Sequence, residues 1–406
     1  MGSAMRRHDF EIRVEFRHRV VFGRDVFAPE NECVAGLLRE GGGRRVLVCI
    51  EEAVDLACGG LTRRVEDYFA DREFDFRGVM VLPGGEEVKA GDGMVKRVWH
   101  EIESQRIDRH SYVLAIGGGA FLDMVGFAAA TAHRGVRLVR FPTTSLAQDD
   151  SGIGVKCAIN WFEKKNWVGS FAVPFAVVND FSFLWTLPAA TLRGGLIEAL
   201  KVALVKDREF FEWIEREVEG LAALRRELVE ECVERSALWH ARHIAESGDP
   251  FETGSSRPLD FGHWAAHKLE QLSGFRVGHA HAVSIGVALD TLYSARCGLL
   301  RRCDAERVLE TIEALNLPVW DESLDLRDES GRRLVHDGLA EFREHLGGEL
   351  TVLLLRELGQ GQDVHALDEV LVDACLDELK RRGPLGRFPN CGEIADDIGE
   401  GWCTSP

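Results

Sequence analysis

The sequence predicts an α/β domain in the N-terminal half of the chain and an all-helical domain in the C-terminal half. Apolar runs typical of buried strands, at residues 44–50 and 112–116, alternate with helical segments in the first half. A run of three glycines directly follows the second of these strands. From about residue 190 onward the periodicity of helices dominates, so we predict two domains, at residues 1–189 and 190–406.

The composition is that of a globular protein with two cores. The chain has 406 residues, of which 45% are hydrophobic and 29% charged. Its net charge of −18 argues against nucleic acid or a membrane surface as a partner, because no basic field attracts phosphate polymers. No apolar run reaches the roughly 18 residues of a membrane span, and the N-terminus is charged rather than signal-like, so we expect a cytoplasmic protein. The cysteines form no C-x-x-C pair, and we assign them no catalytic role.

The first predicted strands lead toward a nucleotide site. Residues 10–22 alternate between apolar and polar side chains and are predicted to form a strand. The strand at 44–50 ends at Glu51, and an acid at the carboxyl end of an early strand often holds a ribose hydroxyl. Helices are expected near residues 54–70, 91–104 and 367–382.

The glycines at 117–119 predict a phosphate-binding turn. Placed between a buried strand and a helix, they let a pyrophosphate approach backbone N–H groups at the helix N-terminus, whose first turn carries Asp123. A tight turn without a ligand is the alternative, since the run matches no G-x-G-x-x-G spacing. The turn that precedes the helix near 91–104 adds Glu86 and Lys89 beside the same predicted site.

The next strand ends in hydroxyl side chains and leads into a polar loop. Thr143 and Thr144 follow the predicted strand at 136–141. The stretch at 148–166 then offers carboxylates and amides, which suit sugar hydroxyls, and ammonium groups, which suit phosphate. These groups are Asp150, Lys156, Asn160, Lys165 and Asn166. A plain solvated loop is the alternative, and the position after a strand of the nucleotide-binding type favours the binding role.

The C-terminal half contains a histidine-rich stretch. His263 and His267 lie four residues apart in a segment that favours helix, so both imidazoles project from one face. A break at 273–274 then brings His279 and His281 back toward that face. Zinc at a catalytic site takes three ligands drawn from His and carboxylate and leaves one position open. The pattern predicts a metal site whose third nitrogen is His279 or His281.

The carboxylate that this metal site needs is best supplied by Glu198, which lies with Lys201 on an otherwise apolar helix. Charges on a buried helix need partners, and a divalent ion together with an anionic substrate would supply them. The alternative is ordinary, because a Glu and a Lys three residues apart usually form a solvated pair and single histidines are usually structural. The nucleotide and phosphate groups upstream favour the metal site.

Taken in order, these motifs resemble the 3-dehydroquinate synthase-like sugar phosphate cyclases over roughly residues 80–290. The resemblance is carried by the glycine turn with its helix, by the stretch from Arg134 to Lys156, by Glu198 with Lys201, and by the segment at 261–267. It implies an NAD- and metal-dependent enzyme with an α/β nucleotide-binding domain and a helical metal-binding domain. It also implies a homodimer that acts on a small sugar phosphate.

The resemblance assigns roles to individual positions. The metal, zinc with cobalt as the alternative, would be held by Glu198, His263 and His279, which selects His279 over His281. NAD would be surrounded by Gly118, Gly119, Asp123, Thr143, Thr144 and Thr186, with Glu86 and Lys89 near its adenosine part, and we add Glu51 and Lys165 to this set. The substrate pocket would be lined by Asp150, Lys156, Asn166, Lys201 and His267, and we add Asp260 to this set. Arg134 matches an arginine that reaches the phosphate in the partner subunit's site.

The chemistry implied by the resemblance is a cycle on one substrate. NAD takes a hydride from a secondary alcohol whose oxygen lies on the metal, and inorganic phosphate then leaves by elimination. The hydride is returned, the sugar ring opens, and an intramolecular aldol closes a carbocycle. NAD therefore acts as a catalyst.

The sequence departs from the dehydroquinate synthase pattern just before the metal-binding helix. Where that pattern has an arginine and an asparagine, this chain has Ser256 and Asp260. A basic group that would meet a substrate carboxylate is lost, and an acid is gained. Two negative charges within a few ångströms in a dry pocket cost several kcal/mol at order of magnitude, which disfavours a carboxylate substrate. Arg257 lies one residue away and is the group that could compensate.

The region toward residue 365 resembles cyclases of the 2-epi-5-epi-valiolone synthase type and the related EboD-type proteins. The leading hypothesis is therefore a cyclase that converts sedoheptulose 7-phosphate, or a close ketose phosphate, into a cyclitol. The first alternative is 3-dehydroquinate synthase itself, with Arg257 meeting the carboxylate. A metal-dependent polyol dehydrogenase of the same broader fold is a more distant alternative, and a non-catalytic binding protein is the least favoured.

Overall fold

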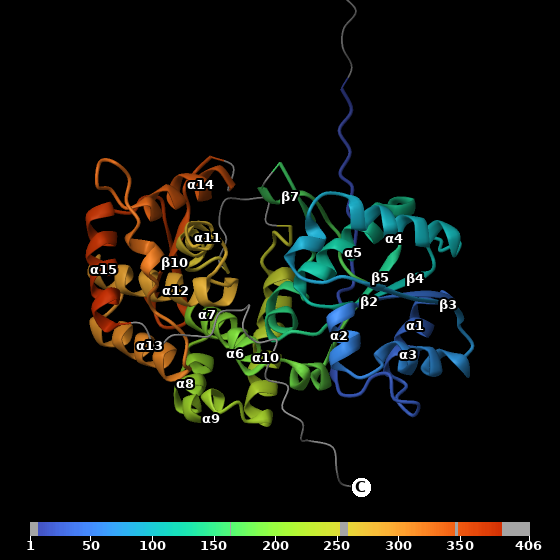
Figure 1. Cartoon of the computed structure of the whole chain (residues 1–406). Coiled ribbons are helices and arrows are strands. Elements are labelled where there is room, and N and C mark those ends of the chain that lie inside the picture. Colours follow the sequence, from blue (N-terminus) through green and yellow to red (C-terminus); the bar gives the residue numbers. More distant parts are fainter. Residues whose placement is uncertain (1–6, 163, 252–258, 346–347, 384–406) are drawn as a thin grey trace, which may run out of the picture.

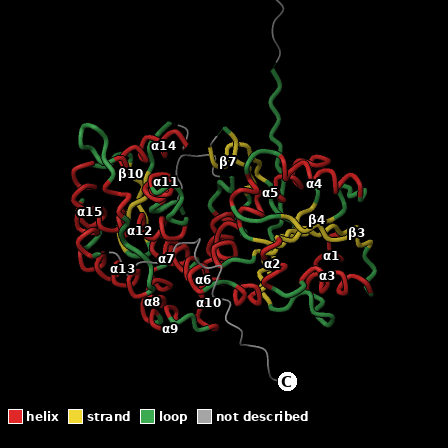
Figure 2. The backbone as a smooth tube through the Cα atoms, viewed as in Figure 1, coloured by secondary structure: helices red, strands yellow, loops and turns green. Residues whose placement is uncertain are grey.

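The computed structural model describes residues 7–162, 164–251, 259–345 and 348–383. Figure 1 shows two lobes, an α/β lobe built from the N-terminal half of the chain and a helical lobe built from the C-terminal half. Figure 2 shows that the long strands gather in the first lobe, whereas helices dominate the second. The predicted fold class is confirmed.

A six-stranded sheet forms the centre of the first lobe, with strand order β1-β8-β5-β4-β2-β3 and every pair parallel. The strands are β1 (Val20–Gly23), β2 (Arg45–Glu51), β3 (Asp75–Leu82), β4 (Tyr112–Gly117), β5 (Arg137–Pro142) and β8 (Ala176–Asp180). Because all strands run the same way, their carboxyl ends lie at one edge of the sheet. Glu51 is the last residue of β2, while Gly118 and Thr143 directly follow β4 and β5. All three therefore lie at the edge where α/β sheets bind ligands.

Helices cover both faces of the sheet. They are α1 (Cys33–Gly41), α2 (Glu52–Ala57), α3 (Leu61–Ala70), α4 (Gly93–Ser104) and α5 (Gly119–Thr131). Val46 and Val48 of β2 share one core with α1 and α3, whereas Leu47 and Cys49 share the opposite core with α4 and α5. Successive strand residues point to opposite faces, so an almost wholly apolar strand is the expected sequence for this position.

Two segments of this lobe differ from the prediction. Of the strand predicted at 10–22, only residues 20–22 enter the sheet, as part of β1, and residues 7–18 have no partner strand in the described chain, although the carbonyl of Arg19 accepts from the N–H of Val177 at 2.7 Å. The alternating pattern is that of a strand, but a strand also needs a neighbour. The polar stretch predicted as a loop contains a π-helical turn (Ala147–Ser151) and the antiparallel hairpin of β6 (Lys156–Trp161) and β7 (Lys164–Phe171). Its charged side chains lie on the exposed face of that hairpin and conceal its strands in the sequence.

The second lobe packs its helices around two buried ones. The helices are α6 (Ala189–Gly194), α7 (Leu196–Lys206), α8 (Arg208–Arg216), α9 (Val218–Ala222), α10 (Arg226–Glu246), α11 (His263–Leu272), α12 (His279–Arg296), α13 (Arg302–Ala314), α14 (Asp337–His345) and α15 (Glu369–Arg382). Residues 196–205 of α7 and 282–294 of α12 are buried throughout, which explains their apolar sequences. A small hairpin, β9 (Val352–Glu357) with β10 (Gln360–Val364), joins this core. Among the described residues, none of the helices combines the length and apolarity that a membrane crossing requires.

Candidate metal and cofactor site

Three of the predicted ligands come from three separate helices and meet at one point. Glu198 lies on α7, His263 is the first residue of α11, and His279 is the first residue of α12. One ligand atom from each lies within 4.8 Å of the other two. The ring centroids of His263 and His279 are 5.6 Å apart. Glu198 is fully buried and His263 is only 7% exposed, so a charge placed between them would be shielded from water.

The close packing of α11 on α12 fixes the start of the metal-binding helix. Gly262 has a φ of 80°, and a Cβ there would lie 2.5 Å from the backbone nitrogen of Val287 on α12. Asp290 of α12 accepts hydrogen bonds from the Gly262 N–H at 3.0 Å and from the Trp264 indole at 2.8 Å. Helix α12 therefore holds both residues that flank His263.

The residues present fit a divalent metal. Neither oxygen of Glu198 accepts a hydrogen bond of normal geometry from the described residues, although the Lys201 ammonium contacts this carboxylate as an ion pair. A buried carboxylate with unsatisfied oxygens is costly unless a cation coordinates it. The Nδ1 of His263 lies 3.3 Å from the carbonyl oxygen of Phe261, which leaves Nε2 for a metal. One carboxylate and two imidazoles form a donor set typical of catalytic zinc.

The pKa values of the two histidines shift in opposite directions. Burial lowers the pKa of His263 well below its ordinary value, and the Lys201 ammonium adds to this effect, so this imidazole is neutral. Burial also acts to lower the pKa of His279, but its contact with the Glu270 carboxylate outweighs burial and raises that pKa. Because a metal binds the neutral imidazole, metal affinity should increase as pH rises.

Glu270 on α11 is a site residue that the sequence analysis missed. It is 5% exposed, its Oε2 lies 3.3 Å from Nδ1 of His279, and its Oε1 accepts a hydrogen bond from Nζ of Lys165 at 3.3 Å. The contact on Nδ1 leaves Nε2 of His279 as the ligand nitrogen. The available signal was its position seven residues after His263, on the same face of the helix.

Replacing Glu270 by glutamine is expected to weaken metal binding by about 10-fold to 100-fold. A neutral amide holds the His279 ring in place less firmly than a carboxylate does, and it stabilises less the tautomer whose Nε2 faces the metal. Competition of the protein with a chelator of known affinity measures this change. Glu341→Gln is the matched control, since Glu341 pairs with Lys268 of α11 at the surface and should leave metal affinity unchanged. Equal metal affinities for Glu270→Gln and the wild type would contradict the role of Glu270.

Lys201 lies among carboxylates beside the metal cluster. It is 2% exposed, and burial acts to lower its pKa. The negative charges of Glu198, Asp150 and Asp260 outweigh burial and raise that pKa, so Lys201 is a buried cation. Burial acts to raise the pKa of Asp150, but His240 and Lys201 outweigh it and lower that pKa. His240 of α10, with Nδ1 3.0 Å from Oδ1 of Asp150, is a second residue that the sequence analysis missed.

Glu51 covers the predicted phosphate-binding turn. Its Oε2 accepts a hydrogen bond from the N–H of Gly118 at 2.6 Å, at the N-terminus of α5. A Cβ at Gly119 would lie 2.6 Å from the hydroxyl oxygen of Ser151, so a larger residue there would require the Ser151 side chain to move. A phosphate bound at this helix end would take the N–H group that Glu51 occupies in this structure.

A buried lysine joins the cofactor residues into one network. Lys89 is 3% exposed, donates to Asp123 at 2.7 Å and also contacts Asn166. The Asn166 N–H donates to Asn160 at 2.9 Å, and the Asn160 amide donates to Glu86 at 3.0 Å. Burial raises the pKa of Asp123 and the Lys89 ammonium opposes that shift. The structure therefore connects Asn166, predicted to line the substrate pocket, directly to the predicted cofactor residues.

The predicted threonines differ in how their hydroxyls are used. Thr143 is buried, and its hydroxyl has no hydrogen-bond partner among the described residues. The hydroxyl of Thr144 accepts from the N–H of Ala147 at 3.1 Å, and that of Thr186 donates to the carbonyl of Phe183 at 2.8 Å. Thr143 is thus the hydroxyl best placed to meet a ligand.

Several predicted residues lie at the margins of this cluster. Lys156 is exposed at the start of β6. Lys165 of β7 points to Glu270 and lies 5.0 Å from the ring centroid of Phe275, so it joins the metal side of the site. Arg134 is exposed in the turn before β5, at the amino end of the sheet and opposite the Gly118 edge, with a φ of 65°. It therefore lies away from the phosphate turn of its own chain.

The remaining histidines flank the cluster. His267 is exposed, with its ring centroid 5.4 Å from that of His263. His281 lies on α12 and is absent from the metal-capable groups of the described residues, and burial lowers its pKa. Ser256 and Arg257, on which the substrate argument partly depends, lie outside the described residues.

Replacing Asp149 by asparagine is expected to remove a pH-dependent loss of stability. Asp149 is fully buried, its carboxylate has no hydrogen-bond partner among the described residues, and burial, with the charges of Glu198 and Asp150, raises its pKa well above the ordinary value. The folded chain holds this proton more tightly than the unfolded chain, so stability is lost as pH rises from the unfolded pKa toward the folded one. Relative to Asp149→Asn, the wild type should lose up to about 1.4 kcal/mol of unfolding free energy per pH unit in that range.

Urea titrations of the metal-free protein from roughly pH 5 to 8 measure this difference. The control is Asp71→Asn, at an exposed position, which should follow the wild type at every pH. Parallel stability curves for the wild type and Asp149→Asn would contradict the prediction.

Comparisons with known proteins agree with this geometry. Residues 79–194 match the family model for the 3-dehydroquinate synthase N-terminal domain, and residues 195–336 match that for the C-terminal domain. The 3-dehydroquinate synthase of Geobacillus thermodenitrificans is 37% identical over 305 residues, which cover 75% of this chain and 80% of that protein.

Solved structures show the same fold. The 2-epi-5-epi-valiolone synthase of Streptomyces hygroscopicus subsp. jinggangensis, solved with NAD+ and Zn2+ bound, superposes with a TM-score of 0.82 and 28% identity, covering 92% of this chain and all of that one. A 2-deoxy-scyllo-inosose synthase complexed with carbaglucose-6-phosphate, NAD+ and Co2+ superposes with a TM-score of 0.72 at 19% identity, covering 88% of this chain and 96% of that one. The latter likeness concerns the fold alone.

Proposed function

This chain belongs to the 3-dehydroquinate synthase family of sugar phosphate cyclases, and from this premise we propose that it converts a C7 ketose phosphate into a cyclitol with loss of inorganic phosphate. Sedoheptulose 7-phosphate is the favoured substrate. The observation that carries this choice is Asp260, whose negative charge acts on the buried Lys201 beside the metal cluster. The pocket therefore already holds a carboxylate near its central cation.

The proposed cofactors are NAD and a divalent metal, zinc or cobalt. Glu198, His263 and His279 would hold the metal, while the Gly118 turn and the Lys89–Asp123 network would hold NAD. When bound, these two groups supply the transient oxidation of a secondary alcohol and the polarisation of its oxygen. The 28% identical valiolone synthase, solved with both groups, supports this pairing.

The remaining steps depend on side chains of this chain. Lys201 presents a buried ammonium that can hold a developing oxyanion, because its pKa stays raised despite burial. Asp150 stays ionised between His240 and Lys201, so it can accept hydrogen bonds from sugar hydroxyls. Lys156 and Lys165 are cations of the hairpin that follows this carboxylate, and they suit the leaving phosphate.

The charge around Lys201 decides between a carboxylated and an uncarboxylated substrate. A substrate carboxylate near Asp260 would meet a like charge in a buried pocket, at a cost of several kcal/mol at order of magnitude. A ketose phosphate without a carboxylate avoids this cost, and its hydroxyls can donate to Asp260. The alternative, 3-dehydroquinate synthase activity, is favoured by the 37% identity to the Geobacillus enzyme and would require a basic group such as Arg257 to offset Asp260.

We also propose that the protein is a homodimer in which Arg134 serves the neighbouring subunit. Arg134 lies at the amino end of the sheet, whereas the predicted substrate groups follow the carboxyl ends of the strands. An exposed arginine at that end is therefore better placed to reach the substrate site of another subunit than the site of its own subunit.

Simultaneous measurement of phosphate and NADH tests the class of reaction. Protein loaded with NAD and zinc should release phosphate from sedoheptulose 7-phosphate without a net rise in NADH absorbance, because the hydride is returned within each cycle. Lys201→Met, which keeps the metal ligands, should lose phosphate release. Net NADH formation without phosphate would instead indicate a polyol dehydrogenase and would overturn the proposal.

A further inference from the structure

A charged side chain lies in the interior of the α/β lobe and forms no ion pair among the described residues. Arg140, near the carboxyl end of β5, is fully buried. Its guanidinium donates to the carbonyl oxygens of Gly152 at 3.2 Å, Gly154 at 2.6 Å and Lys156 at 2.9 Å. It also lies 3.0 Å from the sulfur of Cys157, whose thiol is uncharged because burial raises its pKa. Every hydrogen bond that the described residues offer this guanidinium therefore goes to an uncharged atom.

A guanidinium suits this position because of its shape. Taking a cation out of water without an acid beside it is costly, so an interior arginine needs a role that an uncharged donor cannot fill. An amide or a hydroxyl could donate to one of these carbonyl oxygens. A guanidinium presents its N–H groups in a rigid planar fork, which holds oxygens on two arms at fixed relative positions. Arg140 uses Nη1 for the first two carbonyls and Nη2 for the third.

The segment that this fork holds, residues 152–156, connects two predicted substrate groups. Asp150 precedes the segment, and Lys156 ends it. The backbone carbonyl of Asp150 accepts from two N–H groups of the segment, at 3.0 and 3.3 Å. The two carbonyls of the segment that the fork does not reach are taken by Nε2 of His18 and by the N–H of Ala172, both at 2.8 Å. Each carbonyl of the segment thus has a donor, which fixes its backbone.

The same guanidinium lies against the predicted cofactor helix. Gly126 of α5 makes room for it, since a Cβ there would lie 2.7 Å from the sulfur of Cys157 and 3.5 Å from Nη2 of Arg140. Helix α5 begins at the predicted phosphate-binding turn. Burial raises the pKa of Asp123 on this helix, and Arg140 opposes that shift less than Lys89 does. Arg140 therefore connects the substrate segment to the cofactor side of the site.

We propose that Arg140 is a positioning residue for substrate binding, which fixes the backbone from which the Asp150 carboxylate and the Lys156 ammonium project. His240 holds the Asp150 carboxylate from the helical lobe, at 3.0 Å. In the proposed function Asp150 and Lys156 bind sugar hydroxyls and phosphate, so this inference rests on that function. Because they hold the ground state and the transition state alike, loss of their spacing should raise KM and leave kcat nearly unchanged.

Amide hydrogen exchange of the full-length protein tests the anchoring without the reaction. Arg140→Lys keeps the charge but places its donors on one nitrogen, so it cannot hold carbonyls on two arms. The N–H groups of Ile153 and Gly154 should then exchange at least about 10-fold faster than in the wild type, as measured by mass spectrometry of peptides that span them. Unchanged exchange of these groups in Arg140→Lys would overturn the proposal.

Arg137→Lys is the matched control for the exchange experiment. Arg137 lies at the amino end of the same strand and also donates to backbone carbonyls, those of Gly41 at 2.6 Å and His110 at 3.3 Å. Its variant should leave the exchange of residues 152–156 unchanged. Equal acceleration there by Arg137→Lys and Arg140→Lys would show a general loosening of the lobe and would overturn the proposal.

Steady-state kinetics test the role in substrate binding. In protein loaded with NAD and zinc, Arg140→Lys should raise the KM for sedoheptulose 7-phosphate by about 10-fold to 100-fold and change kcat by less than about 3-fold. A merely structural role would reduce the fraction of folded enzyme, which lowers the apparent kcat and leaves KM unchanged. That result would overturn the proposal. Absence of phosphate release by the wild type would count against the proposed function, whereas the exchange comparison does not depend on the reaction.

Arg140→Gln separates the geometry of the guanidinium from its charge. This variant removes the buried charge and keeps an amide donor, so it should fold without the cost of burying a cation. If the fork positions the segment, both Arg140→Gln and Arg140→Lys should raise KM and accelerate exchange. A defect in Arg140→Gln together with wild-type behaviour of Arg140→Lys would assign the effect to charge alone and would overturn the positioning role.

Discussion

Alanine at position 263 is expected to abolish tight metal binding and to lower phosphate release by roughly 10³-fold or more. His263 supplies one of three ligand atoms that lie within 4.8 Å of one another, and it is neutral because burial lowers its pKa. Removing it leaves only Glu198 and His279 of this set, which is too few ligands for a catalytic zinc site, and the second metal-capable group, His267, Glu270 and His279, lacks the buried Glu198. Metal content after dialysis and the rate of phosphate release measure the two effects.

His281→Ala is the matched control for this experiment. His281 lies on the same turn of α12 as His279, and the sequence alone left both histidines open as the third ligand. In the structure it is absent from the metal-capable groups of the described residues, so its variant should keep the metal. Loss of metal from His281→Ala, with retention in His263→Ala, would contradict the assigned ligand set.

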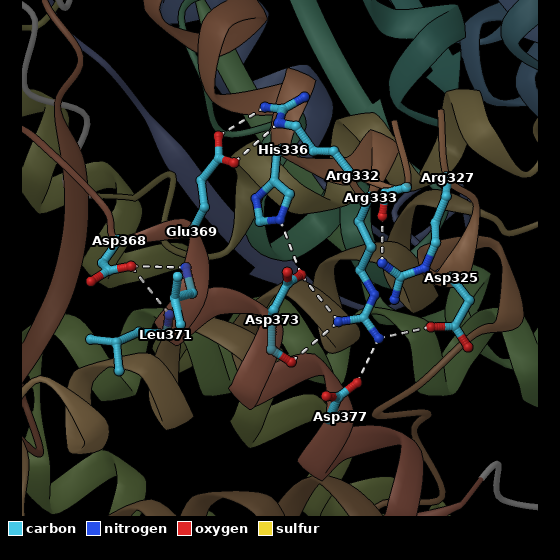
Figure 3. Close-up of polar contacts among 12 residues, drawn as sticks. Asp325, Arg327, Arg332, Arg333, His336, Asp368, Glu369, Leu371, Asp373 and Asp377 are labelled. Atoms are coloured by element: carbon cyan, nitrogen blue, oxygen red, sulfur yellow. Dashed lines mark hydrogen bonds and ion pairs between the residues drawn. The ribbon is translucent and has the colours of Figure 1, made fainter. Parts of the chain in front are cut away.

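Arg333→Ala is expected to lower the free energy of unfolding by about 3 kcal/mol. Figure 3 shows Arg333 surrounded by Asp325, Asp373 and Asp377, with dashed contacts to each, and His336 also meets Asp373 at 3.1 Å. The arginine side chain is 3% exposed, so its removal strips three carboxylates of their shared cation. Breaking a buried ion pair costs about 3–5 kcal/mol, and the low end applies because the aspartates still reach water.

The neighbouring Arg332 provides a control of the same residue type. It pairs with Glu369 and Asp337, but its side chain is 37% exposed, and exposed pairs contribute at most about 1 kcal/mol. Urea unfolding of Arg332→Ala and Arg333→Ala measures both values. Similar losses for the two variants would show that burial of Arg333 does not matter. A large loss for Arg333 alone would identify this network as what ties α15 to the segment that packs on α11.

Much of the site could be predicted because its residues lie at features that the sequence displays. The glycines at 117–119 follow a buried strand, and His263 and His267 stand four apart on a helix, so local spacing was enough to identify them. Glu198 and His279 required the assumption that distant segments meet. The structure brings them together through the packing of α7, α11 and α12.

The residues that were missed act through contacts between distant segments. His240 meets Asp150 from a helix ninety residues away, and Glu270 meets both Lys165 and His279, while each looks like an ordinary polar residue in the sequence. The strand predicted at 10–22 failed for a related reason. Its alternating pattern is typical of a strand, but among the described residues no partner strand lies beside residues 7–18, and pairing begins only at Arg19, whose carbonyl accepts from the N–H of Val177.

The central claim is tested most directly by phosphate release from two substrates, measured side by side with zinc- and NAD-loaded protein. One substrate is sedoheptulose 7-phosphate, and the other is the carboxylated C7 phosphate that 3-dehydroquinate synthases use. Turnover of sedoheptulose 7-phosphate alone is the predicted result. The Asp260→Asn variant should then show a smaller preference for sedoheptulose 7-phosphate over the carboxylated substrate, because the substitution removes the charge that repels a carboxylate. Turnover of the carboxylated substrate alone would contradict the claim and would make this protein a divergent 3-dehydroquinate synthase.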